Sequence, residues 1–194
     1  QGVHDNYEID IFKYLIAQAA QVLNCKDLHS CSLRIIADHI RAAIFLISEG
    51  ITPDHVGRGY VLRRIIRRAV RHGYKLGSKQ AFFYKLLSPA LTVMGSAYPE
   101  LIKNKVKIIE ILQQEENKFA TTLYQGVQLF EETLTRLNTK IIPGEVVFKL
   151  YDTYGFPIDL TADMARERDL SLDVVGFEMA MNEQRERARS HSKF

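Results

Sequence analysis

Residues 57–73 read GRGYVLRRIIRRAVRHG, and the periodicity of this stretch is that of an α-helix. Placed at 100° per residue on a helix, its arginines gather on one side and its apolar residues on the other. The arginines of that face are Arg63, Arg64, Arg67, Arg68 and Arg71. We therefore predict a basic amphipathic helix over about residues 58–72, ended by Gly73. Its apolar side should be buried, and all five guanidinium groups should face outward.

The basic charge of the chain is confined to one segment. Between His55 and Pro99 there are nine lysines and arginines and no aspartate or glutamate, while both flanks carry an acidic surplus. The net charge of +3 therefore arises from this segment alone. A block of one sign repels itself unless an anion faces it, which favours contact with nucleic-acid phosphates. The alternative is a solvated helix face.

Helical spacing of apolar residues extends along the rest of the chain. Only 11 glycines and five prolines interrupt the 194 residues, so we expect few turns and long elements. Further helices are predicted over about 6–23, 30–50, 82–94, 144–153, 158–168 and 173–190. A long helix over about 100–138 repeats its apolar residues every eleven positions, with a break at Gly126 as the alternative. The predicted fold is all-α, one domain over 1–194 with sub-parts 1–98 and 99–194.

The composition excludes several functional classes. Apolar runs are shorter than the roughly 18 residues of a membrane span, and two cysteines cannot build a disulfide framework, so we expect a soluble, cytoplasmic protein. Because no nucleophile elbow or phosphate-binding loop is present, no catalytic residue is predicted. Cys25, His29 and Cys31 lack the spacing of zinc ligand pairs, so no metal site is expected. The chain begins with Gln1, which we interpret as a piece of a longer protein.

Asp152 stands near a predicted helix end, where the helix dipole disfavours a negative charge by some tenths of a kcal/mol. Within four positions of it, Lys149 is the one basic residue. A capping or solvated carboxylate is one interpretation. The other is a carboxylate that accepts a hydrogen bond from a base amino group, as a reader of RNA sequence would.

Three stretches together resemble one known family. They are residues 36–42 (IADHIRA), the block 57–73 quoted above, and residues 150–161 (LYDTYGFPIDLT). Over essentially all 194 residues the chain resembles the alanyl-tRNA synthetases, in the helical tRNA-recognition region that follows their class II catalytic core. The resemblance implies that the catalytic and editing domains lie elsewhere in a longer chain. It implies ATP, magnesium and zinc for that whole enzyme and no cofactor for this piece, which should be inactive alone.

The resemblance also implies a partner and a set of contact residues. The partner is the tRNA for alanine, whose acceptor stem carries a G·U wobble at its third base pair. Asp152 is implied as one reader of that pair, and His55 stands where the family has a second reader, an asparagine. In place of the family's usual Ser-Asn-Glu-Gly, residues 54–57 read DHVG. Phosphate contact is expected from the basic residues Arg58, Arg63, Arg64, Arg67, Arg68, Arg71 and Lys75.

Two other functions are compatible with the same residues. A generic RNA-binding helical module would bind through charge and would ignore the third base pair. A structural linker between the catalytic and editing domains would use its arginines for stability and not for RNA. A measured preference for one third base pair would favour acceptor-stem recognition over the generic module. A loss of RNA affinity on changing the arginines would favour it over the structural linker.

Overall fold

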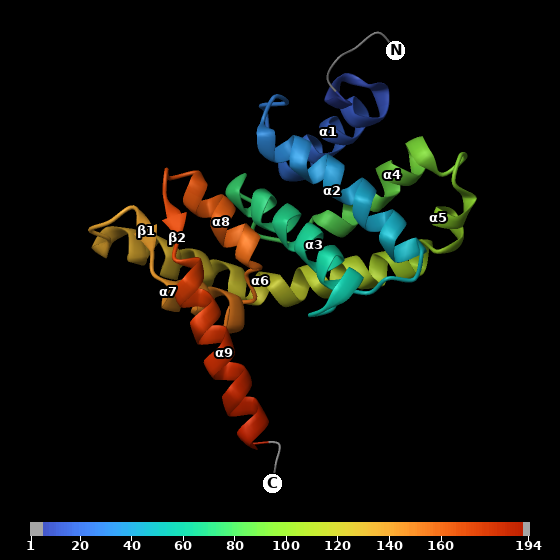
Figure 1. The fold of residues 1–194 in the computed structure, drawn as a ribbon. Coiled ribbons are helices and arrows are strands. Elements are labelled where there is room, and N and C mark those ends of the chain that lie inside the picture. The colour runs from blue at the N-terminus through green and yellow to red at the C-terminus, as the bar shows by residue number, and fades with distance from the viewer. Residues whose placement is uncertain (1–5, 192–194) are drawn as a thin grey trace. The chain divides into compact units, whose positions relative to one another are not determined.

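The computed structural model describes residues 6–191 and is predominantly helical (Figure 1). In chain order its elements are the 3₁₀-helix η1 (Asn6–Glu8), α1 (Asp10–Leu23), α2 (Cys31–Ser48), α3 (Gly57–Lys75), the 3₁₀-helix η2 (Phe83–Leu86), α4 (Leu87–Met94), α5 (Pro99–Lys103), α6 (Lys105–Arg136), β1 (Ile141–Ile142), α7 (Gly144–Asp152), α8 (Ile158–Arg166), β2 (Ser171–Leu172) and α9 (Val174–His191). The prediction of an all-α fold is confirmed, because the two strands of the described range have two residues each. Every helix in that range is too short or too polar to pass through a lipid bilayer.

The described chain divides into two compact units, and the division falls after Ala120, within α6. This boundary differs from the sub-parts 1–98 and 99–194 expected from the sequence. Residues 99–120 belong to the first unit because α5 packs on α2 and because two glutamates of α6 bond to groups in α3 and η2.

In the first unit, α2 packs against both α1 and α3 (Figure 1). The buried apolar residues of α2 recur with helical spacing and are Leu33, Ile36, Ala37, Ile40, Ala43, Ile44 and Ile47. The apolar face of α3 adds Leu62, Ile66 and Ala69 to the buried core. Burial of each large aliphatic side chain stabilises the fold by about 1.5–3 kcal/mol, so α3 is held in one rotation about its axis.

The helix α3 continues past its predicted end. Gly73 lies inside the helix, and a side chain there would overlap the ring of Phe82. The helix ends at Lys75, and Gly77 adopts a φ of 94° while its N–H donates to the carbonyl of Tyr74 at 2.9 Å. The prediction that Gly73 ends the helix is wrong, because a sequence does not distinguish a glycine required for packing from one required by the backbone.

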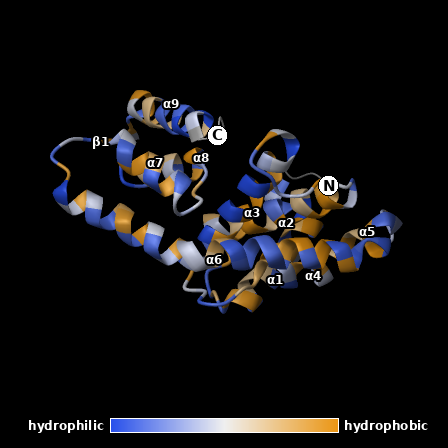
Figure 2. Ribbon diagram, turned by 90° about the horizontal axis from the view of Figure 1, so that it is seen from below, coloured by the Kyte–Doolittle hydropathy of each residue, from blue (hydrophilic) through white to orange (hydrophobic). Residues whose placement is uncertain are grey.

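The long apolar stripe predicted over 100–138 forms two helices. They are separated at Asn104, whose Nδ2 donates to Ser48 Oγ at 3.0 Å. After Asn104, α6 continues without a break to Arg136 (Figure 2). The alternative of a break at Gly126 is wrong. That glycine is buried within α6 because the aromatic ring of Phe156 lies against it.

The second unit contains the end of α6 together with α7, α8 and α9. The helix α7 contacts both α8 and α9. Strands β1 and β2 pair in parallel, with Ile141 opposite Ser171, and are too short to show the alternation that identifies a strand in a sequence. The predicted cap of the last helix is confirmed, since Oδ1 of Asp173 accepts a hydrogen bond from the N–H of Gly176 at 2.9 Å.

Replacing Gly126 with alanine should destabilise the second unit, even though alanine favours a helix by about 1 kcal/mol over glycine. The added methyl group would overlap the Phe156 ring, and overpacking of this kind costs about 1–3 kcal/mol. Urea unfolding followed by circular dichroism measures the difference. Gln125→Ala, on the exposed side of the same helix, is the matched control and should change stability by less than about 0.5 kcal/mol. A Gly126→Ala chain as stable as the parent would contradict the packing argument.

Candidate nucleic-acid interface

The basic residues of α3 divide into a buried and a more exposed group. Arg67 and Arg71 are only 4% and 6% exposed. The exposed and half-buried members are Arg58, Arg63, Arg64, Arg68 and Lys75. The prediction that all five guanidinium groups of the arginine face point outward is therefore wrong for Arg67 and Arg71.

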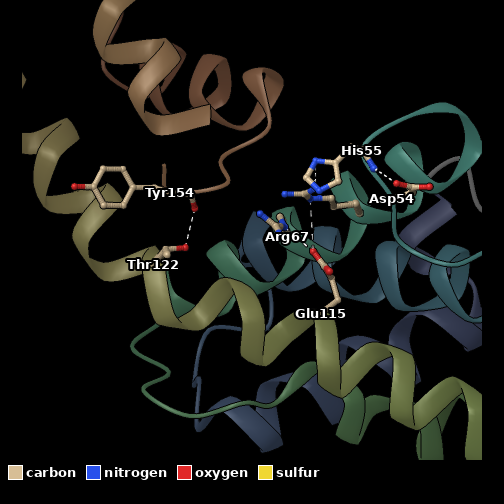
Figure 3. Close-up of polar contacts among 7 residues, drawn as sticks. Asp54, His55, Arg67, Glu115, Thr122 and Tyr154 are labelled. Carbon is tan, nitrogen blue, oxygen red and sulfur yellow. Dashed lines mark hydrogen bonds and ion pairs between the residues drawn. The ribbon is translucent and has the colours of Figure 1, made fainter. Parts of the chain in front are cut away.

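Arg67 is buried because α6 covers the middle of the arginine face. Its Nε donates to Oε1 of Glu115 at 2.6 Å (Figure 3). Its guanidinium carbon lies 5.0 Å from the centre of the Phe119 ring. Burial lowers the pKa of Arg67, and the charge of Glu115 opposes that shift. A helical wheel identifies which residues share a face. It does not identify an element 48 residues away that covers the face.

Arg63 connects the same glutamate to the loop that precedes α3. Its Nε lies 3.8 Å from Oε1 of Glu115, and its Nη1 lies 2.8 Å from Nδ1 and 3.0 Å from Nε2 of His55. The N–H of His55 donates in turn to Oδ1 of Asp54 at 2.6 Å. The structure thus brings together two predicted contact residues, His55 and Arg63. It joins both to the buried pair of Arg67 and Glu115.

Sequence reasoning missed two residues of this region, the neighbouring glutamates Glu115 and Glu116. The carboxylate of Glu116 accepts the N–H of Phe82 at 2.7 Å and that of Phe83 at 2.9 Å, which holds the start of η2. Burial raises the pKa of Glu116, and these backbone donors oppose the shift. The sequence did contain an indication of this role. Both glutamates lie between the apolar residues Leu112 and Phe119, on the side of the helix that is buried, and a buried carboxylate needs a hydrogen-bonding or charged partner.

Asp152 is the last residue of α7, and it is exposed. Its Oδ1 accepts a hydrogen bond from Nε2 of Gln184 on α9 at 2.6 Å. Both residues belong to the second unit, whereas His55 and the arginines of α3 belong to the first. Gln184 was not singled out in the sequence, because a lone glutamine among charged residues forms no pattern.

The turn that follows Asp152 is attached to α6. Oγ1 of Thr122 donates to the carbonyl of Tyr154 at 2.7 Å (Figure 3), and the Phe156 ring packs on Gly126. These two contacts fix the end of α7 within the second unit.

The described residues offer charge and hydrogen bonding as their chemistry. Among residues 6–190, no three side chains of His, Cys, Asp or Glu gather closely enough to hold a metal ion. Cys25 is half-buried, with its Sγ 3.7 Å from the carbonyl of Asp27, and Cys31 is exposed at the start of α2. Cationic groups on α3 can contact anions, and the carboxylate at the end of α7 can accept a hydrogen bond from a ligand.

Comparison with known proteins gives a match along the entire chain. Residues 1–194 match the family described as tRNA synthetases class II (A). Over all 194 residues the chain is 57% identical to an alanine–tRNA ligase of Nitrosospira multiformis, 58% identical to one of Pseudoalteromonas translucida and 55% identical to one of Pseudomonas entomophila. The chain spans 22% of the length of each of these relatives.

Replacing Glu115 with glutamine should strongly destabilise the first unit. The substitution keeps the shape of the side chain but leaves the buried guanidinium of Arg67 without its counter-charge. Breaking a buried pair in this way costs about 3–5 kcal/mol. Urea unfolding followed by circular dichroism measures the loss.

Glu110→Gln is the matched control, because Glu110 is exposed on the same helix and should tolerate the change within about 0.5 kcal/mol. The double variant Arg67→Met/Glu115→Leu should recover much of the stability, since neither charge is then left alone in the interior. A Glu115→Gln chain with the stability of the control would show that the pair does not anchor α3.

Proposed function

The chain belongs to the class II (A) tRNA synthetases, and from this premise we propose that it recognises the acceptor stem of the tRNA for alanine within a longer alanine–tRNA ligase. In this proposal it also identifies a G·U wobble at the third base pair. The observation that carries the proposal is the acid-free basic segment 55–99, set in a chain that matches alanine–tRNA ligases from end to end. An RNA stem is the polyanion that such a segment suits.

The more exposed cations of α3 are proposed to contact the phosphates. Arg58 and Lys75 are exposed at opposite ends of the helix, so the basic groups extend over about 26 Å at 1.5 Å per residue. Between them, Arg64 is oriented by the ring of Tyr60, whose centre lies 5.8 Å from the guanidinium carbon. Arg67 and Arg71 are assigned to the interior, where they hold the helix. Phosphate contacts of this kind fix the register of the RNA without reading its sequence.

Asp152 is proposed to read the wobble pair. An A-form stem presents base edges in a wide, shallow minor groove, and in a G·U pair the guanine amino group there has no Watson–Crick partner. An ionised carboxylate only accepts hydrogen bonds, so it suits that donor. A stem without the free amino group would leave the carboxylate oxygen that faces the base desolvated and unsatisfied, and this penalty produces the discrimination.

His55 is proposed as the second contact at the wobble pair, in the place of the family's asparagine. A neutral imidazole has one donor and one acceptor nitrogen, which is part of the hydrogen-bonding capacity of an amide. Arg63 holds the ring against the start of α3, so the loop presents it in a defined position.

The ATP-dependent chemistry is proposed to lie in other parts of the longer enzyme. Alanine–tRNA ligase activity, with ATP, magnesium and zinc, is therefore proposed for the whole protein, and residues 1–194 alone should be inactive.

A structural role is the second candidate, and a specific observation favours it for part of the basic face. Arg67 and Arg71 are buried, and Arg67 is paired with Glu115, so these two arginines act within the fold. A wholly structural α3 predicts that loss of Arg58 or Arg64 leaves RNA affinity unchanged.

Arg58→Ala and Arg64→Ala should each weaken tRNA binding by the longer enzyme to the same degree for G·U and G·C stems. Each lost phosphate contact should also flatten the plot of log affinity against log salt by about 0.7–0.9. Binding titrations at several salt concentrations measure both effects. Lys107→Ala, an exposed cation outside the acid-free segment, is the charge-matched control. A change in base-pair preference without a change in salt slope would refute the phosphate assignment.

Asp152→Ala should reduce the preference of the longer enzyme for the G·U pair over a G·C pair. A base contact of this kind is worth about 1–3 kcal/mol, so kcat/KM discrimination should fall by about 5- to 150-fold. The melting temperature should change little, because the side chain is exposed. Charging assays with the two tRNAs measure the ratio.

Glu178→Ala provides an exposed carboxylate on α9 as the control for Asp152. If Asp152→Ala keeps the full preference for G·U, the reader lies elsewhere. If the variant unfolds, Asp152 is a structural residue of the helix end.

A further inference from the structure

The carboxylate of Asp152 stands on a pair of helices that are joined at several points. At their starts, Gly144 of α7 lies so close to the backbone of Gly176 of α9 that a side chain on Gly144 would overlap it. Further along, the rings of Tyr151 and Phe177 meet edge to face with their centres 5.6 Å apart. These contacts determine the position of α9 relative to the end of α7.

Gln184 lies two helical turns after Phe177, so the two side chains leave the same face of α9. Its Nε2 reaches Oδ1 of Asp152 at 2.6 Å. An ionised carboxylate has no hydrogen to donate, so the amide must present its N–H and not its oxygen to Asp152. The bond is made to Oδ1 of the carboxylate, and Oδ2 takes no part in it.

We propose that Gln184 is a positioning residue for the carboxylate of Asp152. The inference rests on the proposed function, in which Asp152 accepts a hydrogen bond from the guanine amino group of the wobble pair. An exposed aspartate at a helix end is otherwise free to rotate about its side-chain bonds, and RNA would have to restrict that rotation on binding. A side chain already held by Gln184 avoids this loss of entropy.

The chemistry of the donor favours this role. Glutamine is neutral, so it orients the carboxylate without cancelling the charge that attracts the amino group of the base. A lysine or arginine would form a stronger, charge-assisted bond and would compete with the base for the same acceptor. The position of α9 thereby affects base reading through the hydrogen bond from Gln184 to Asp152.

The experiment compares Gln184→Ala and Gln184→Glu in the longer enzyme. Loss of the amide donor in Gln184→Ala should reduce kcat/KM discrimination between G·U and G·C tRNAs by about two- to tenfold. Gln184→Glu should reduce it further, since a carboxylate cannot donate and repels Asp152. The melting temperature should not change in Gln184→Ala. Asn182→Ala, about 200° around α9 from Gln184, is the matched control and should leave discrimination unchanged.

A double-mutant cycle makes the test specific. In the Asp152→Ala background, Gln184→Ala should have no further effect, because no carboxylate remains to position. An undiminished effect in that background, or an equal loss of charging for both tRNAs, would overturn the inference. Unchanged discrimination in Gln184→Ala, with Asp152→Ala showing its full loss, would also overturn the inference while leaving the proposed function intact. If the proposed function is wrong, the Asp152→Ala variant by itself will keep its full preference for the G·U tRNA.

Discussion

The ion pair between Arg67 and Glu115 fixes how α3 is rotated in the first unit. Moving a guanidinium or a carboxylate out of water costs several kcal/mol, and each of these groups is nearly inaccessible to solvent. Turning Arg67 outward would remove the donor 2.6 Å from the buried carboxylate of Glu115 and leave it only the longer contact with Arg63 at 3.8 Å. The pair therefore forces the middle of the basic helix inward, together with Arg71 one turn later, and leaves Arg58 and Lys75 exposed at its two ends.

Two adjacent carboxylates of α6 serve different elements. Glu115 pairs with α3, and Glu116, about 100° further around the helix, accepts the backbone N–H groups at the start of η2. One turn of α6 thus provides a counter-charge for the buried guanidinium of Arg67 and a hydrogen-bond acceptor for the backbone N–H groups of Phe82 and Phe83. Arg63 extends the first arrangement to His55, so the loop before α3 is tied to the interior through charged groups.

The proposed recognition of RNA divides between two kinds of interaction. Exposed cations attract phosphates over distances comparable to the Debye length, so small displacements of the RNA change their interaction little. The affinity that they provide is weakened by salt. A hydrogen bond from a base amino group acts only over a narrow range of distance and direction. Base reading therefore needs an oriented acceptor, and in the second unit the contacts of α7 with α9 and of the following turn with α6 restrict the position of Asp152.

The helical fold and the basic helix followed from the sequence alone, because periodicity and charge are local properties of the chain. The sequence also identified Asp173 as a helix cap, since a cap lies within three residues of its partner. Only the tertiary structure shows that Arg67 and Arg71 are buried, that aromatic rings pack on Gly73 and Gly126, and that Gln184 donates a hydrogen bond to Asp152. Each of these facts depends on a partner distant in sequence, such as Glu115 for Arg67 or α9 for Asp152. Helical periodicity specifies the face on which a side chain lies, but only the packing of the chain specifies what that face meets.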